Sequence, residues 1–502
     1  MRKSVGVLCS LALLAPGFGS ASFAQDAPPE PAPREGYCRL PAALPDLGPE
    51  TENQKGQERP TRARRGAEVD SAVMASPPPP PAAMAESASD GDSVVVTASR
   101  IGGDSASDES LSPSVDSPVA GIIRPPMPPR PPGPTPQSGL LTAGEHDDLL
   151  NPELYADYVR KSNVGQEVRD LPRVDTSRML TVEVRDAKGQ AMPFEAVELR
   201  CADGNSLKFE TVADGRVVFF PEHDRLSEDV WIRAGSSRWR KVRVSQEPGS
   251  QTITITHKAP TRAVTRLDLA LVVDVTGSMS DELSYLQAEL ASIVDDLKDR
   301  HKDLDIQIGF TFYRDQGDAF VTRTFGFGSD IIGAQKHLAA QRAQGGGDYP
   351  EAMQEALIRA AGQEWRENAV KTLLLVADAP PHNHDIAMTW RAAEHLRQHR
   401  VHIVPVGASG VADTAEYVMR AMAAMTQSRY TFLTEDSGIG NPKAPPAIDC
   451  YLVTRLDQLL RRVIDSQISG RRIEPEKDEV IRSVGQYDAG RCILPPDFGQ
   501  EA

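Results

Sequence analysis

Apolar residues in the second half of the chain alternate between short dense runs and longer stretches with helical periodicity. Leu267 to Val273 is a short, mostly apolar run, which is typical of a strand covered on both faces. In the next stretch, apolar side chains recur every three or four positions, which predicts a helix over 280–299. This alternation continues to about residue 470 and predicts an α/β domain with a doubly wound, mostly parallel sheet over 265–470.

The remaining elements of this α/β pattern can be placed along the sequence. We expect strands at 306–313, 321–325, 372–377, 401–407 and 430–433. We expect helices at 350–361, 386–399, 414–425 and 453–469, the first of them opened by a proline. Ligands of doubly wound sheets bind at the carboxyl ends of the strands, so the loops that follow these strands are where a site should lie.

An earlier region, 178–257, shows the two-residue alternation of half-buried strands. Residues 179–185 alternate apolar and polar side chains, and a turn signal follows at 186–189. Further short strands at regular spacing predict a small antiparallel β-sandwich. The pattern resembles the carboxypeptidase-regulatory-like and other immunoglobulin-like modules of exported proteins. It contains no cluster of titratable residues, so we expect a spacing or supporting role.

The rest of the chain has little of this patterning. Residues 25–140 hold 23 of the 40 prolines, together with much Ser, Ala, Asp and Gly, and we expect them to be disordered or extended. We expect a short helical linker over 141–177. Around 139–165 we expect a helical element with an apolar stripe formed by Leu149, Leu150, Leu154 and Tyr155. Residues 471–502 are expected to be a C-terminal tail.

Residues 1–24 have the features of an export signal. Two basic residues precede a short apolar run, and Ser22 and Ala24 are small residues at the positions that a signal peptidase reads. We predict cleavage after Ala24. A short membrane anchor is the alternative, which the brevity of the apolar run disfavours. Since no other segment is long and apolar enough to cross a bilayer, we expect an exported protein that is periplasmic or extracellular.

Charge and cysteine content narrow the classes of function. The chain has 71 acidic against 55 basic residues, a formal net charge of -16, which argues against a nucleic-acid partner and suits a protein that collects cations. Four cysteines lie outside the export signal, at Cys38, Cys201, Cys450 and Cys492. An even number in an exported chain permits disulfides. We favour a pair between Cys450 and Cys492, with free buried thiols as the alternative.

Three loops at the ends of expected strands contain hard oxygen ligands. In chain order, these ligands are Asp274, Thr276 and Ser278 in the first loop, Asp348 in the second and Asp378 in the third. Alternate spacing turns the carboxylate and both hydroxyls of the first loop to one side, and three glycines before Asp348 allow unusual backbone angles. An all-oxygen site selects Mg²⁺, Ca²⁺ or Mn²⁺, and a small number of protein ligands leaves the water that Mg²⁺ retains.

These loops resemble the metal-ion-dependent adhesion site of the von Willebrand factor type A domain, over residues of about 265–470. The family's Asp-x-Ser-x-Ser loop matches Asp274, Thr276 and Ser278, and threonine keeps the hydroxyl. The second-loop ligand of the family is usually Thr, whereas Asp348 stands here; its extra charge should tighten cation binding and weaken the capture of an acidic partner. The resemblance implies a bound Mg²⁺ and a protein partner whose acidic residue completes the coordination.

Two further groups near these loops could bind metal. Asp281 and Glu282 extend the first loop and resemble the adjacent second metal site of some integrin subunits, but we favour the alternative of acidic residues in the first turn of a helix. His382 and His384 could bind a transition metal. A surface loop fits them better, because three ligands at an ordered spacing are not visible.

Three functions follow from these observations. The first is a metal-dependent adhesion or scaffold protein. The second is an envelope component coupled to a TonB-type system, because residues 93–100 resemble the segment of outer-membrane receptors to which an energy-coupling protein adds a strand. A chance valine run is the alternative there. The third, a metal-dependent hydrolase, is disfavoured: the haloacid-dehalogenase loop needs an Asp where Thr276 stands, and no Walker loop or nucleophile elbow is present. We expect no enzyme activity.

Overall fold

The computed structural model describes residues 36–52, 137–162, 164, 173–347, 349–408, 410–411, 413–439 and 443–494. The export signal, residues 93–100 and Asp348 lie outside these ranges, and Asp281 and Glu282 are described by their backbone alone.

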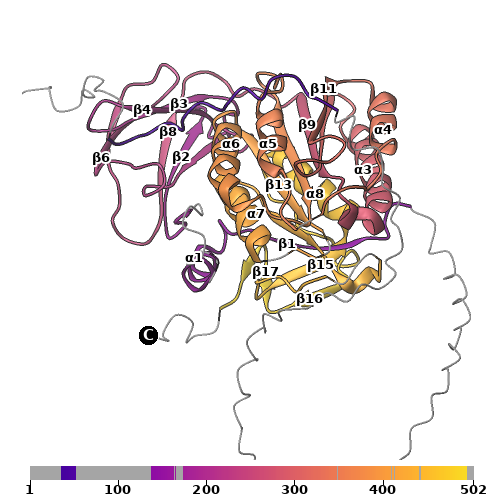
Figure 1. Ribbon diagram of the computed structural model, residues 1–502. Coiled ribbons are helices and arrows are strands. Elements are labelled where there is room, and N and C mark those ends of the chain that lie inside the picture. Colours follow the sequence, from indigo (N-terminus) through magenta and orange to yellow (C-terminus); the bar gives the residue numbers. More distant parts are fainter. Residues whose placement is uncertain are drawn as a thin grey trace, which may run out of the picture. The chain divides into compact units, whose positions relative to one another are not determined.

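A nine-stranded sheet forms the larger part of the fold (Figure 1). Its parallel strands are, in spatial order, β10 (Asp305–Tyr313), β9 (Arg266–Asp274), β12 (Val370–Ala377), β13 (Val401–Gly407) and β14 (Tyr430–Leu433). β11 (Thr322–Gly328) pairs antiparallel to β10 at one edge. All eight residues of β12 are buried, as expected of a strand covered on both faces. The predicted α/β fold with a doubly wound sheet is confirmed.

Helices pack on both faces of the sheet, and alternate residues of β9 show how. Leu269 and Leu271 belong to one core, which includes side chains of α3 (Ser280–Arg300), α4 (Ile331–Ala339) and α8 (Leu456–Ser469). Ala270 and Val272 belong to a second core, with α5 (Met353–Ala361), α6 (Ile386–Gln398) and α7 (Asp413–Met425). Within the described part of the chain, no helix is both long and apolar enough to span a bilayer.

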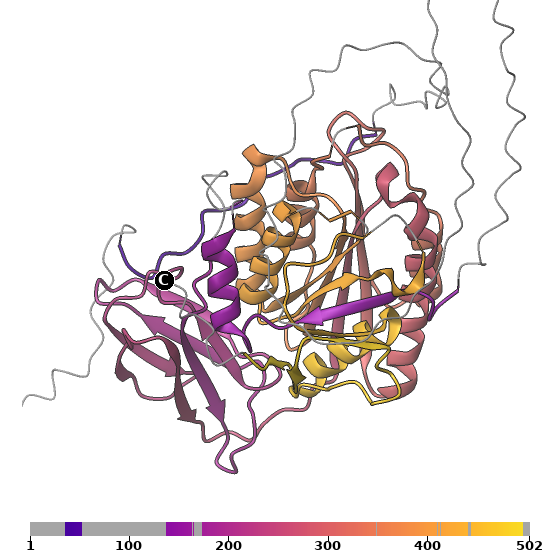
Figure 2. The same ribbon diagram turned by 90° about the horizontal axis from the view of Figure 1, so that it is seen from below.

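The sheet continues through a strand from the N-terminal side of the chain. β1 (Thr142–His146) lies between β14 and β15 (Tyr451–Arg455), antiparallel to both, and β16 (Arg482–Val484) forms the far edge. Figure 2 shows β1 in purple beside the yellow C-terminal strands. The sequence predicted a helical linker here, whereas a buried strand comes first and α1 (Pro152–Lys161) follows. The short sequence TAGEH has no apolar run, and distant strands bury it.

The C-terminal region departs from its prediction in two places. The helix expected over 453–469 begins only at Leu456, because β15 precedes it. The tail expected from 471 contributes β16 to the sheet and then forms a hairpin of β17 (Tyr487–Asp488) and β18 (Arg491–Cys492). A disulfide joins Cys450, just before β15, to Cys492, so the pairing favoured from the sequence is confirmed.

A β-sandwich occupies the sequence between β1 and β9. One sheet has the order β5 (Arg216–Phe219), β2 (Arg178–Arg185) and β8 (Gly249–Thr256). The other has the order β4 (Ser206–Glu210), β3 (Ala196–Arg200), β6 (Asp229–Ala234) and β7 (Arg240–Arg243). The pairings are antiparallel as predicted, except that β2 and β8 run parallel. The sandwich is therefore an insertion between two strands of the same nine-stranded sheet.

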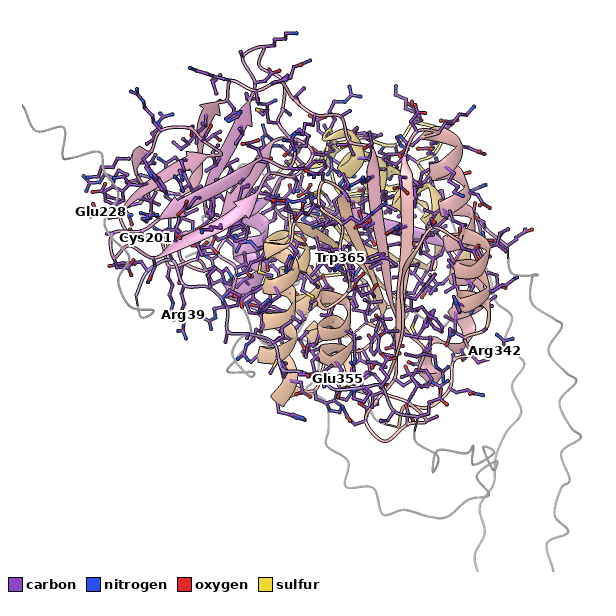
Figure 3. The ribbon with its side chains drawn as sticks, turned by 90° about the horizontal axis from the view of Figure 1, so that it is seen from above. Arg39, Cys201, Glu228, Arg342, Glu355 and Trp365 are labelled. Carbon is purple, nitrogen blue, oxygen red and sulfur yellow. A yellow bond between two sulfur atoms is a disulfide. The ribbon has the colours of Figure 1, made fainter. Side chains whose placement is uncertain are left out.

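Residues 36–52 are extended and anchored along the folded chain. A disulfide joins Cys38 to Cys201 after β3; Figure 3 labels Cys201 and Arg39, the neighbour of Cys38. Further along, the carbonyl of Gly48 accepts a hydrogen bond from Arg359 over 2.7 Å. The Glu50 carboxylate accepts from the amide of Thr324 in β11 over 2.9 Å. The sequence predicted a disordered or extended segment here, and these contacts with distant elements hold it in place.

Candidate metal centre

The three loops identified from the sequence meet at the carboxyl ends of β9 and β12. The amide of Gly277 in the first loop donates to the carbonyl of Gly345 in the second over 3.1 Å. The hydroxyl of Tyr349, which ends the second loop, donates to the carbonyl of Asp378 in the third over 2.9 Å. Strand order reverses between β9 and β12, and this is the position at which open α/β sheets bind ligands.

The first loop gathers three oxygen ligands. Asp274 ends β9, and its Oδ1 accepts hydrogen bonds from the amide of Thr276 over 2.9 Å and from the hydroxyl of Thr276 over 2.6 Å. The hydroxyls of Thr276 and Ser278 are 3.2 Å apart. A short 3₁₀ turn (Gly277–Met279) follows, and α3 begins at Ser280. The three side chains lie on the same side of the loop, as the sequence predicted.

The glycines of the second loop are required by its backbone and by its neighbours. Gly345 and Gly346 have φ angles of +82° and +67°, in the left-handed region that favours glycine. A Cβ atom on Gly346 would lie 2.9 Å from Oε1 of Glu351 and 3.3 Å from Cβ of Thr276. The loop can therefore approach the first loop only with glycine at this position.

The third loop brings a second buried carboxylate to the site. Asp378 follows β12 and accepts a hydrogen bond from the hydroxyl of Ser278. Oδ2 of Asp274 and Oδ1 of Asp378 are buried without a hydrogen bond of good geometry among the described residues, and the buried hydroxyl of Tyr313 lies beside Asp274. Burial, and then the charge of Asp378, raises the pKa of Asp274 to about 7, and burial raises the pKa of Asp378. Two acids are thus held together, and no ion pair with a positive side chain balances either of them among the described residues.

A third buried carboxylate, which the sequence analysis did not single out, belongs to Glu351. Its side chain is 3% exposed and its Oε2 has no hydrogen-bond partner among the described residues. Burial, and then the charges of Asp274 and Asp315, raises the pKa of Glu351 to about 9. A glutamate just before a helix is common, since the helix N-terminus favours acids. The one signal in the sequence is its position four residues after the last glycine of the glycine-rich loop.

The donor set at this position fits a hard divalent cation. The described ligands are two carboxylates with unpaired buried oxygens, Asp274 and Asp378, and the hydroxyls of Thr276 and Ser278. Asp348 is the remaining expected ligand and lies outside the described residues. Within the described ranges, no three His, Cys, Asp or Glu side chains form a metal-binding group. The fit therefore rests on the unpaired oxygens and on the hard, oxygen-only chemistry of the donors.

The other proposed metal ligands lie around this centre. Asp281 and Glu282 fall in the first turn of α3, the position we favoured for them. Nε2 of His382 lies 2.7 Å from Oδ1 of Asp315, whereas the exposed His384 pairs with Asp385. The two histidines thus have separate carboxylate partners, as side chains of a surface loop commonly do.

Comparison with known proteins agrees with this architecture. Residues 268–440 match the family model of the von Willebrand factor A domain, and the chain therefore contains a domain of this family. Alpha-protein kinase vwkA of Dictyostelium discoideum is 33% identical over 138 residues, which are 27% of this chain and 22% of that protein. A putative ariadne-like RING finger protein, R811, of Acanthamoeba polyphaga mimivirus is 38% identical over 120 residues, 23% of this chain and 11% of that protein. This chain thus spans less than a quarter of either relative.

Solved structures with a similar fold include two bacterial proteins. The conserved hypothetical protein BatB of Bacteroides thetaiotaomicron is 12% identical with a TM-score of 0.29, covering 40% of this chain and 98% of that one. The pilus adhesin SpaC of Lactobacillus rhamnosus GG is 13% identical with a TM-score of 0.27, covering 44% and 30%. Neither likeness is close enough to support a functional argument. The family match itself indicates a role in protein interaction or adhesion.

Proposed function

We propose that this protein is an exported, divalent-metal-dependent protein-binding protein of the adhesion or scaffold type, without enzyme activity. The observation that carries the proposal is the meeting of three loops around the unpaired, buried oxygens of Asp274 and Asp378. Buried carboxylate oxygens without donors are costly, and a cation between them would remove that cost. Mg²⁺ is the proposed ion, with Ca²⁺ and Mn²⁺ as alternatives.

The proposed mechanism assigns a task to each loop. Asp274, Thr276 and Ser278 would hold the cation from one side and Asp378 from another, with Asp348 as the further ligand implied by the family resemblance. The bound cation supplies an open coordination position for an oxygen of a partner, which we propose to be an acidic side chain. Tyr349, 44% exposed at the rim, has its hydroxyl fixed by the carbonyls of Asp378 and Gly410, so its ring is oriented for contact with a partner.

Calorimetric titration of the full chain with Mg²⁺, Ca²⁺ and Mn²⁺ tests this proposal. Asp274→Ala and Asp378→Ala should abolish saturable binding, because each removes a ligand with an unpaired oxygen. Asp330→Ala is the matched control: Asp330 caps α4 by accepting from the amide of Gly333, outside the three loops. Absence of binding to the unaltered protein would refute the metal-dependent mechanism and leave the domain as a scaffold.

Export is tested separately from metal binding. N-terminal sequencing of the protein recovered from the periplasm or the medium should begin at Gln25, the residue after the expected cleavage. Recovery of the intact N-terminus in the membrane fraction would instead favour the anchor.

A further inference from the structure

We propose that Glu351 is a positioning residue of the metal centre, which accepts a hydrogen bond from a water molecule on the bound cation. The inference rests on the proposed metal-dependent function and extends it to a residue outside the five ligands that the family resemblance implies.

The first argument is the location of the Glu351 side chain. Its Oε1 lies 2.9 Å from the point at which a Cβ atom on Gly346 would stand, and that same point is 3.3 Å from Cβ of Thr276. The carboxylate therefore reaches past the glycine-rich loop toward the first loop. With 3% of its surface exposed, the side chain faces the interior of the site and not bulk solvent.

The second argument is that the backbone of Glu351 is fixed in this place. Its amide donates to the carbonyl of Pro380 in the third loop over 3.0 Å, and its carbonyl accepts from the amide of Met353 at the start of α5 over 2.8 Å. Glu351 and Pro381 also form a parallel β-bridge. These contacts fix the position of the Glu351 backbone at the junction of the second and third loops.

The third argument is the missing donor. Oε2 of Glu351 is buried and has no hydrogen-bond partner in the described part of the chain. Its acidic neighbours have partners of their own: Asp315 lies beside His382, and Asp318 accepts from the amide of Gly346. Since a buried carboxylate oxygen without a donor is costly, a donor from outside the described residues would remove that cost.

Water on a divalent cation is the donor that this position suits. Mg²⁺ keeps several of its water molecules when it binds to proteins, and their O–H groups are strongly polarised. Direct coordination fits less well, because the described acids do not converge into a group of three around one point. Residues that hold metal-bound groups in this way commonly change metal affinity by about 10- to 100-fold when they are replaced.

The consequence for the site is that, once a cation is bound, Glu351 would add a further carboxylate of the protein's own to its surroundings. A cation held by Asp274 and Asp378 and supported by Glu351 stays bound before a partner arrives. A partner would then add its oxygen at the open position of a cation that is already bound.

Titration of the full chain with Mg²⁺ and two matched variants tests the inference. Glu351→Gln keeps the size of the side chain but removes the acceptor charge, and we expect affinity for Mg²⁺ to fall about tenfold or more. Glu355→Gln is the matched control, because it makes the same substitution one helical turn later. The Glu355 side chain is partly exposed and accepts a hydrogen bond from Gln316. The affinity of this variant for Mg²⁺ should stay within about twofold of that of the unaltered protein. Glu355 is labelled in Figure 3.

A second measurement separates this role from a purely structural one. The thermal midpoint of the metal-free Glu351→Gln protein should equal or exceed that of the unaltered protein, because a neutral side chain of the same size replaces a buried acid that has no described cationic partner. Equal Mg²⁺ affinities of the Glu351→Gln and unaltered proteins, equal losses in both variants, or failure of Glu351→Gln to fold would each overturn the inference. If the unaltered protein binds no Mg²⁺, the proposed function itself fails; binding that Asp274→Ala abolishes and Glu351→Gln leaves intact refutes only the role of Glu351.

Discussion

Asparagine in place of Asp274 should stabilise the metal-free protein and abolish its response to Mg²⁺. Asp274 is fully buried at the end of β9, beside the carboxylate of Asp378. Asparagine keeps an oxygen that can accept from the amide and hydroxyl of Thr276, the two hydrogen bonds that close the first loop. The substitution therefore removes the buried charge while it leaves the local hydrogen bonds in place.

The size of the effect follows from the pKa of Asp274. Burial and Asp378 raise this pKa from 3.8 to about 7. At 1.36 kcal/mol per unit, the shift is worth about 4 kcal/mol. The folded state keeps a proton that the unfolded state has lost, so stability falls as pH rises between these two values, and the full penalty applies above pH 7. At pH 8, the Asn variant should melt roughly 5–10 °C higher than the unaltered metal-free protein.

Thermal unfolding in a chelator at pH 8 and pH 5, repeated with Mg²⁺, measures this effect. The gain should shrink at pH 5, and only the unaltered protein should be stabilised by Mg²⁺, by about 2.7 kcal/mol at a concentration 100-fold above Kd. Asp268→Asn is the control on the same strand. Asp268 is equally buried but pairs with Arg366 at 2.6 Å, so its loss should destabilise. Destabilisation by Asp274→Asn at pH 8, or a Mg²⁺ response that survives in it, would refute the reasoning.

Three further predictions concern stability away from the metal centre. Glu145→Gln removes the carboxylate shared by the buried Arg429 and Arg462, of which Arg462 keeps Glu479 at 3.7 Å, and should lower the free energy of unfolding in urea by about 3 kcal/mol; a change below about 1 kcal/mol would contradict this. Burial lowers the pKa of His402 from 6.5 to about 4, so stability should fall as pH decreases through that window, by about 3 kcal/mol in total, and His402→Asn should lack this dependence. Cys450→Ser combined with Cys492→Ser opens a loop with a separation of 42 residues and should cost about 4 kcal/mol, measured by urea unfolding against the oxidised protein.

The α/β core could be predicted because its strands are covered on both faces by the helices next to them in sequence. Val401–Gly407 and Tyr430–Leu433 are apolar runs of strand length, and the structure places strands at both. The first metal loop was also visible, since Asp274, Thr276 and Ser278 need only a strand end and alternate spacing to converge. These are local properties, and a local pattern in the sequence is sufficient to show them.

β1 and Glu351 could not be predicted, because their surroundings are assembled from distant parts of the chain. Thr-Ala-Gly-Glu-His is not apolar, and Glu145 within it is buried only because Arg429 and Arg462 neutralise it. Burial raises the pKa of Glu145, but the arginines outweigh it and lower the value to about 2. Glu351 likewise depends on Pro380 and on the first loop for its enclosure. No periodicity in the sequence signals such an environment.

The position of β1 in the sheet also sets the order in which the chain can be completed. Glu145 bonds to Arg429 and Arg462 across sequence separations of 284 and 317 residues, so β1 leaves the ribosome long before its partners are made. The β-sandwich and the metal loops can form in the meantime, whereas the sheet closes only when β15 arrives, a long-range and therefore slow step. A chain interrupted before Tyr451 would leave β1 with one neighbouring strand and an open edge that favours aggregation. Closure of the sheet thus distinguishes a finished chain from a truncated one.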